Sequence, residues 1–244
     1  MIEILATPIA LVIILVMLHA YFGMGILERG IIFTDLAIAQ FAALGSAIGL
    51  GYFHEEHLYL FTLSFALLCG LLIAIASTRA LNLEAFIGLL YVLGASGIMM
   101  VLADSAEGME HFKSLLASDI LFTPTSEVIK SAFIYAAIAL ALWKLYPRLQ
   151  GFMRELVFFS LLALTVTSSV ALAGVLVVFV LLIAPAIVAQ RFHKGLLGAF
   201  IFGWGFSITA IFLSYYYDMP TGYTIVFLGA LLSATTILAS SKKI

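Results

Sequence analysis

The sequence predicts an all-α integral membrane protein that crosses the bilayer eight or nine times. Of its 244 residues, 64% are hydrophobic and 10% are charged, whereas a soluble domain is about half apolar and about a quarter charged. The mean hydropathy is +1.22. The 11 Lys and Arg and 13 Asp and Glu residues are too few to coat a globule of this size in water, so a lipid bilayer is the solvent that suits most of its surface.

Apolar runs of membrane-spanning length fill almost the whole chain. A helix that crosses about 30 Å of hydrocarbon needs roughly 20 apolar residues. The runs extend over Ile4–Leu27, Ile31–Phe53, Leu58–Ser77, Ala85–Ala103, Val128–Leu145, Leu156–Ala171, Ala173–Ala189, Gly195–Tyr215 and Tyr223–Ala239. The sixth and seventh share one unbroken stretch, in which one of them could be re-entrant. We expect residues 1–244 to form a single transmembrane domain with no soluble domain.

The basic residues predict the orientation, because Lys and Arg are retained on the cytoplasmic side. With the N-terminus outside, nine of the eleven basic residues face the cytoplasm. These are Arg29, Arg79, Lys144, Arg148, Arg154, Arg191, Lys194, Lys242 and Lys243. The outer loops collect acidic side chains instead, so the predicted outer surface is negative.

Several function classes are disfavoured by the composition. The net charge of -2 does not suit nucleic-acid binding, which needs a basic surface. A single cysteine, Cys69, excludes an internal disulfide and a cysteine-based metal site. The sequence contains no Gly-x-x-x-x-Gly-Lys-Ser/Thr phosphate loop, so any ATP that drives the protein is hydrolysed by another chain.

The first candidate site lies within the membrane, where an ionisable side chain is by default a functional hypothesis. Asp35 follows Arg29 by six residues, and His19 precedes Arg29 by ten on the preceding span. Both side chains therefore fall in the inner half of the bilayer and could meet. Gln40 adds an oxygen ligand, and this set suits zinc, manganese or ferrous ions. Alternatively, Asp35 caps its helix or pairs with Arg29, and His19 satisfies a carbonyl in the core.

The second candidate site is a cation-collecting entrance on the outer side. It would be formed by His54, Glu55, Glu56 and His57, together with His111 in the other acidic loop. The spacing is not that of a zinc protease, which has His-Glu-x-x-His. The alternative is a solvated turn, since a short loop between membrane helices is polar in any case.

Small residues and one proline indicate close helix packing. Gly45–Gly49 and Gly94–Gly97 present flat faces to another backbone, within one subunit or between two. Pro185 removes a backbone hydrogen bond, so we expect it to kink or break the seventh span.

Four segments carry a resemblance to a known family. They are Phe33–Gln40 followed by Gly45, Ser118–Leu121 followed by Thr123 and Pro124, Ala173–Phe192 with Pro185 inside it, and the outer turn Tyr216–Gly222, which contains Asp218. Together they resemble the membrane permeases of bacterial ABC transporters that import zinc, manganese or iron. The family motif usually has a histidine four residues after the aspartate, where this chain has Ala39.

The resemblance implies a permease dimer in the cytoplasmic (inner) membrane of a bacterium, with the ion path formed by the permease. It also implies an ATP-binding subunit below and an extracytoplasmic metal-binding protein above. The chain itself would bind no cofactor, and a divalent metal ion would be its substrate. The ATPase-coupling loop would contain Arg148, Gln150, Gly151 and Arg154, a segment shorter than in most members.

Two other function classes compete with an ABC permease. The first is a proton-coupled secondary transporter of a metal ion or small solute, in which Asp35 carries the proton. Such transporters often have matching broken helices in two halves, and the sequence has one candidate break, near Pro185. The second is a membrane enzyme, but no span places a nucleophile beside a base.

Overall fold

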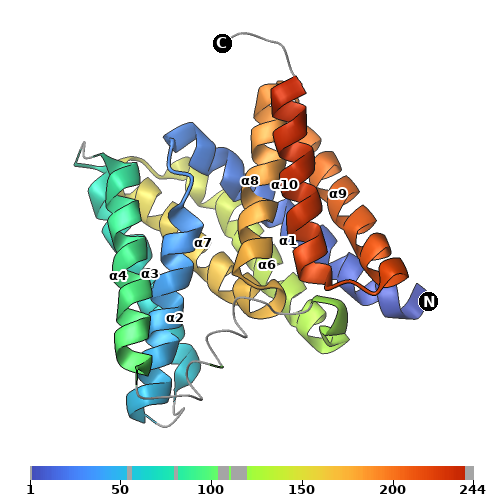
Figure 1. Ribbon diagram of the computed structural model, residues 1–244. Helices are drawn as coiled ribbons and strands as arrows, with labels where there is room; N and C mark the ends of the chain where they lie inside the picture. The colour runs from blue at the N-terminus through green and yellow to red at the C-terminus, as the bar shows by residue number, and fades with distance from the viewer. Residues whose placement is uncertain (1, 54–56, 80–81, 104–109, 111–119, 240–244) are drawn as a thin grey trace. The chain divides into compact units, whose positions relative to one another are not determined.

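The computed structural model describes residues 2–53, 57–79, 82–103, 110 and 120–239, and these form helices without strands. The long helices are α1 (Ile2–Arg29), α2 (Thr34–Phe53), α3 (Leu58–Ser77), α4 (Leu83–Leu102), α6 (Thr125–Lys144), α7 (Gly151–Ala173), α8 (Val175–Arg191), α9 (Gly195–Tyr217) and α10 (Thr221–Ala239) (Figure 1). Two short 3₁₀ helices are η1 (Ile120–Phe122) and η2 (Tyr146–Arg148). The all-α prediction is confirmed.

Each predicted apolar run coincides with one of these long helices. Eight of them are long and apolar enough to cross a membrane, and α8 is a shorter apolar helix of 17 residues. At 1.5 Å per residue α8 is about 25 Å long. Gly174 separates α7 from α8 with φ 81° and ψ 155°, a conformation open only to glycine. The unbroken apolar stretch there therefore consists of two helices.

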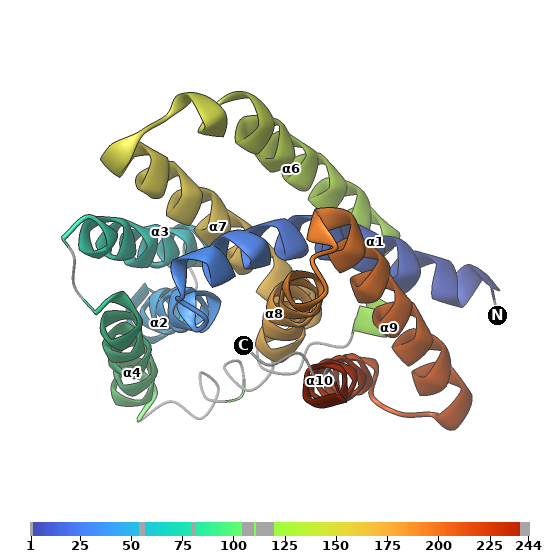
Figure 2. The ribbon, with the colours of Figure 1, turned by 90° about the horizontal axis from the view of Figure 1, so that it is seen from above.

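The chain forms two compact units, each built from distant parts of the sequence. Unit 1 contains Met1–Arg29, Ala117–Tyr135 and Leu172–Ile244, and unit 2 contains Gly30–Leu116 and Ala136–Ala171. In unit 1, α8, α9 and α10 pack against one another, and α1 packs against α8 and α9. In unit 2, α2 packs between α3 and α4 (Figure 2).

Glycines allow the close helix contacts of unit 1. A methyl group at Gly203 of α9 would lie 2.6 Å from Val16 Cγ1 of α1 and 3.1 Å from Pro185 Cγ of α8. At the next residue of α9, the Trp204 indole N–H donates to the Ile13 carbonyl of α1 at 3.2 Å. The missing side chain of Gly203 therefore lets α1 and α8 approach the same face of α9.

The small-residue faces predicted from the sequence lie at helix contacts within unit 2. A methyl group at Gly45 of α2 would lie 2.8 Å from the carbonyl carbon of Phe61 on α3. A methyl group at Gly94 of α4 would lie 2.9 Å from Gln40 Cβ on α2. These contacts lie within one chain, so the intramolecular alternative is confirmed for both glycines.

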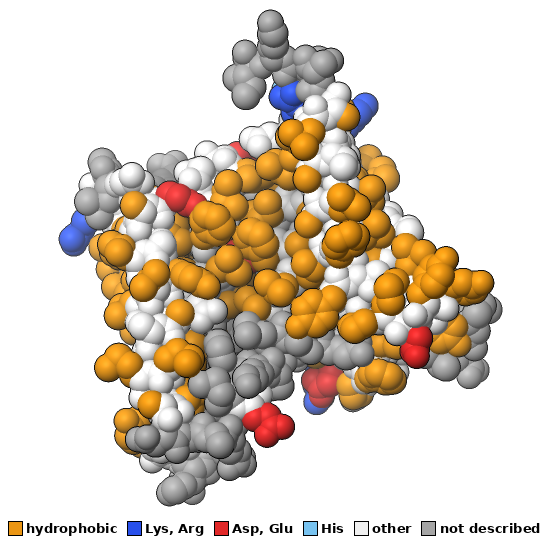
Figure 3. All heavy atoms as spheres, in the orientation of Figure 1, with side chains coloured by type: hydrophobic (Ala, Val, Ile, Leu, Met, Phe, Trp, Pro, Cys, Tyr) orange, Lys and Arg blue, Asp and Glu red, His pale blue; other side chains and the backbone are white. Residues whose placement is uncertain are grey.

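Hydrophobic side chains dominate the exposed surface of the described helices. Among the most exposed are Leu89 (70%), Met100 (79%) and Phe227 (69%). In Figure 3 such side chains cover the visible faces of α4 and α10, and the Lys, Arg, Asp and Glu side chains lie toward the helix ends. This distribution is the one expected for helices whose sides contact lipid.

Candidate ion path and coupling loop

Asp35 is buried in the first turn of α2. The Phe33 carbonyl accepts the first hydrogen bond of the helix, from the Ala37 N–H at 3.1 Å. The Thr34 hydroxyl donates to the Ile31 carbonyl at 2.7 Å. Asp35 is 1% exposed, and the contacts of its carboxylate are with the backbone N–H groups of Leu36 and Asp35 at the start of its own helix. Arg29 belongs to unit 1 and Asp35 to unit 2, so the alternative of an ion pair between them stays open.

Gln40 lies further along α2 and is also buried, at 7% exposure. Its Oε1 has no hydrogen-bond partner in the described part of the chain. Five residues of helix separate Asp35 from Gln40, which corresponds to about 7.5 Å of rise and about 140° of rotation. Because the two side chains leave different faces of α2, they suit successive contacts along a path better than joint ligation of one ion.

His19 is fully buried in α1, with 0% exposure. Its Nδ1 lies 2.7 Å from the Leu15 carbonyl. Because a carbonyl only accepts, Nδ1 must carry the hydrogen, and Nε2 is the acceptor nitrogen of the neutral ring. The His19 ring thus satisfies a backbone carbonyl in the core, which is the structural alternative to an ion-binding role. His19 belongs to unit 1 and Asp35 to unit 2, so a meeting of the two side chains stays a prediction.

Only one residue of the predicted outer entrance is described. His57 is exposed, with φ 61°, and precedes α3. Its carbonyl accepts hydrogen bonds from the Leu60 and Phe61 N–H groups at 2.8 and 3.2 Å. His54, Glu55, Glu56 and His111 lie outside the described residues. Among the residues that the structure covers, no three His, Cys, Asp or Glu side chains are grouped as a metal site, and so the entrance stays a prediction.

The predicted coupling loop is a short connection between α6 and α7. Tyr146 of η2 is buried at 9% exposure, and its ring packs against Phe158 of α7 with 6.0 Å between centroids. Arg148, Gln150 and Gly151 are exposed, and Gly151 has φ 54°.

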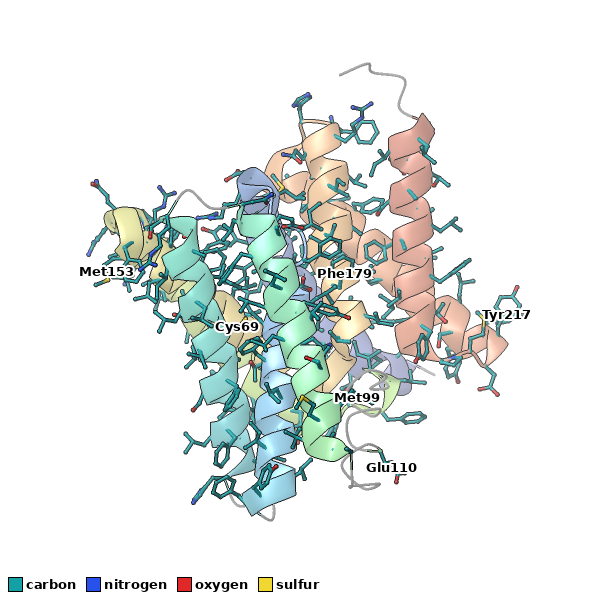
Figure 4. All side chains as sticks on the ribbon, turned by 60° about the vertical axis from the view of Figure 1, so that its left-hand side comes forward. Cys69, Met99, Glu110, Met153, Phe179 and Tyr217 are labelled. Carbon is teal, nitrogen blue, oxygen red and sulfur yellow. The ribbon has the colours of Figure 1, made fainter. Side chains whose placement is uncertain are left out.

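The first turn of α7 adds exposed side chains to this loop. Arg154 is exposed, and Met153, labelled on this turn in Figure 4, is 56% exposed. Phe152 is 38% exposed. The connection therefore presents both cationic and apolar side chains to a partner. The packing of Tyr146 against Phe158 fixes the connection to α7.

Pro185 and Asp218 are the two residues for which the sequence predicted a structural role. α8 continues through Pro185 from Val175 to Arg191, so the helix does not break at this proline, and the kink stays a prediction; the proline ring lies beside Gly203. Asp218 ends α9 with φ 53° and ψ 45°. Beside it, the Ser214 hydroxyl contacts the Thr221 hydroxyl at 2.7 Å. The turn between α9 and α10 is thus held by side chains at both ends, Ser214 before it and Thr221 after it.

Glu84 is a partly buried residue with a buried Oε2, and the sequence did not predict a role for it. It lies in the first turn of α4, after the capping residue Asn82. Its carboxylate accepts hydrogen bonds from the backbone N–H groups of Phe33 and Ile32, which lead into α2. The only sequence signal was an acidic residue at the start of an apolar run, which is common at helix N-termini.

Comparisons with known proteins agree with this architecture. Residues 148–240 match the model of the ABC 3 transport family. A protein of Haemophilus influenzae named "Probable iron transport system membrane protein" is 31% identical, over 56% of this chain and 58% of that protein. The match therefore spans less than two thirds of that relative.

Two solved structures share the fold over nearly the whole chain. PsaBC from Streptococcus pneumoniae, in complex with a Fab, superposes with a TM-score of 0.77 at 17% identity, covering 98% of this chain and 92% of that one. A structure described as an inward-facing metal-chelate type ABC transporter gives a TM-score of 0.68 at 17% identity, covering 95% and 85%. The chain therefore shares the fold of these two solved structures, and its residues 148–240 match the model of the ABC 3 transport family.

Proposed function

We propose that this chain is the permease subunit of an ABC importer for a divalent metal ion. Zinc, manganese and iron are the candidate ions, and the name of the Haemophilus influenzae relative favours iron. The observation that carries the proposal is Asp35, which is 1% exposed and whose carboxylate contacts only backbone N–H groups of its own first turn among the described residues. Such a charge in a membrane span is costly unless a metal ion or a proton neutralises it.

The path would offer oxygen ligands in succession. A cation at Asp35 meets a carboxylate, and further along α2 it meets the amide oxygen of Gln40, which is buried without a partner. His19 would add an imidazole if α1 lines the same path. Carboxylate and amide oxygens suit manganese and ferrous ions, and an added imidazole makes the set suitable for zinc as well. The acidic outer loops would raise the local cation concentration before entry.

ATP hydrolysis would take place on a partner subunit, because the sequence holds no phosphate loop. The exposed Arg148 and Met153 beside the α6–α7 connection offer that subunit charged and apolar contacts. We place this loop in the cytoplasm of a bacterium and the N-terminus outside the inner membrane. The complete importer would contain a permease dimer, an ATP-binding subunit and an extracytoplasmic metal-binding protein.

The proposal is tested by uptake into vesicles that contain the permease with its ATPase subunit. We expect radioactive zinc, manganese or iron to accumulate only when ATP is supplied, and to continue accumulating when a protonophore collapses the proton gradient. Accumulation that persists without ATP but stops with the protonophore would instead establish the proton-coupled transporter.

A further inference from the structure

Helices α2 and α4 are parallel neighbours within unit 2. A methyl group at Gly94 would lie 2.9 Å from Gln40 Cβ, one at Gly97 3.0 Å from Leu44 Cδ1, and one at Gly51 3.3 Å from Val101 Cγ1. These contacts advance together along both helices, so the helices run in the same direction. The same register brings the start of α4 level with the start of α2.

Glu84 makes the contact at this end of the pair. Its carboxylate accepts hydrogen bonds from the backbone N–H groups of Phe33 and Ile32. Phe33 is the capping residue of α2, because its carbonyl accepts from the Ala37 N–H at 3.1 Å. The Phe33 side chain has no oxygen that could serve the free N–H groups of the helix start.

The α4 helix does not need Glu84 for its own N-terminus. The Asn82 Oδ1 already accepts from the Ala85 N–H at 3.3 Å. Glu84 is therefore a cap supplied by one helix to the start of its neighbour. Its Oε2 is buried and has no partner among the described residues, so one carboxylate oxygen serves the two N–H groups.

We propose that Glu84 is a positioning residue for the Asp35 segment of α2. Asp35 lies between two attachments to α4, the Glu84 cap before it and the Gly94–Gln40 contact after it. Charge-assisted hydrogen bonds to a helix N-terminus are stronger than neutral ones. Without the cap the first turn of α2 frays, and the Asp35 carboxylate loses its fixed place. This role rests on the proposed ion-path function of Asp35.

Hydrogen exchange of the permease–ATPase complex in nanodiscs tests the cap directly. In Glu84→Leu we expect the amides of residues 34–37 to exchange about tenfold faster or more, since hydrogen bonds to a charged group are lost. Glu84→Gln keeps the Oε1 acceptor, so its exchange should stay within about threefold of the native protein. Glu127→Leu is the matched control, because Glu127 is another first-turn glutamate whose partner, at 2.7 Å, is Lys130 of its own helix.

Metal uptake distinguishes a positioning role of Glu84 from a requirement for the negative charge of its side chain. We expect Glu84→Leu to raise the KM for the metal severalfold and Glu84→Gln to restore it. Loss of uptake in both variants would overturn the proposal, as would unchanged exchange in Glu84→Leu. If Glu84→Leu does not insert, Glu84→Ser, which is too short to reach the Phe33 N–H, replaces it. Faster exchange in Glu84→Leu together with normal uptake by Asp35→Asn would reject the ion-path function and leave the cap in place.

Discussion

The guanidinium of Arg154 lies over the ring of Tyr146, with 5.0 Å between Cζ and the ring centroid. Tyr146 in turn packs against Phe158, so the first turn of α7 is fastened to the 3₁₀ helix before it. An exposed cation–π contact of this kind contributes about 0.5–1 kcal/mol. Both arginines predicted to bind the ATPase are exposed, and Arg154 also has an internal contact, with Tyr146.

Replacing Arg154 should loosen this loop. We expect Arg154→Ala to lower the free energy of unfolding by about 0.5–1 kcal/mol, through loss of the contact with Tyr146. Arg154→Lys should recover part of it, because an ammonium group also binds an aromatic face. Thermal unfolding of the purified protein measures the change, with Arg148→Ala as the unaffected control. Equal melting temperatures for Arg154→Ala and the native protein would contradict the prediction.

Reversing the charge of Arg148 should weaken ATPase binding without weakening the fold. We expect Arg148→Glu to reduce copurification of the ATPase subunit by about tenfold, the effect of about 1.4 kcal/mol at an interface. Arg79→Glu is the matched control, because Arg79 is exposed in a different predicted cytoplasmic loop. Undiminished recovery of the ATPase with Arg148→Glu would place the docking surface elsewhere.

Removing the charge of Asp35 should stop transport while the protein still inserts. We expect Asp35→Asn to reduce ATP-driven metal uptake by about 100-fold or more, because the buried anion that offsets the cation charge is lost. Asp218→Asn controls for the loss of an aspartate, since Asp218 lies in an exposed turn. Normal uptake by Asp35→Asn at equal protein levels would remove Asp35 from the path.

A side chain at Gly94 should separate α4 from α2. The methyl group of Gly94→Ala would lie 2.9 Å from Gln40 Cβ and 3.1 Å from the Gln40 carbonyl carbon, so the helices must move apart. We expect a loss of about 1–3 kcal/mol in unfolding free energy and a matching fall in uptake. Gly88→Ala is the control on the same helix, because nothing lies within 4 Å of its added methyl group. The prediction fails if the two variants unfold alike.

The stability of the turn between α9 and α10 should depend on the Ser214 hydroxyl. Ser214 Oγ donates to the Met219 carbonyl and contacts Thr221 Oγ1 at 2.7 Å. Ser214→Ala should cost about 1–2 kcal/mol, because buried partners are left unsatisfied. Thr209→Ala on the same helix removes only a bond to its own turn, at Gly205. Hydrogen exchange at Met219 and Thr221 should rise in the first variant alone.

The fold was largely predictable because lipid requires long apolar helices, and apolar runs are visible in one dimension. What the sequence could not reveal is where one apolar helix ends against the next. Gly174 has apolar residues on both sides, so no change of polarity marks it. A proline inside an apolar run is compatible with a broken, a kinked or a continuous helix, so the sequence could not show that α8 continues through Pro185.

The candidate site was predictable only in part. Asp35 was found because a charged residue inside a span is conspicuous on its own. Glu84 was missed because its partners, the N–H groups of Ile32 and Phe33, lie about fifty residues earlier in the chain. A contact of that kind depends on the parallel packing of α2 and α4, which no local spacing reveals. Gln40 was found as an oxygen ligand, but not as a contact of Gly94.

The single-residue joint at Gly174 also governs how the topology of this protein can be mapped. Reporter tags are usually inserted between spans, yet here 23-residue and 17-residue helices meet with one glycine between them. A tag at this joint would replace a single glycine between two apolar helices, so its accessibility would describe an altered protein. Inserts belong instead beside the exposed Thr78 and Arg79, which follow the end of α3.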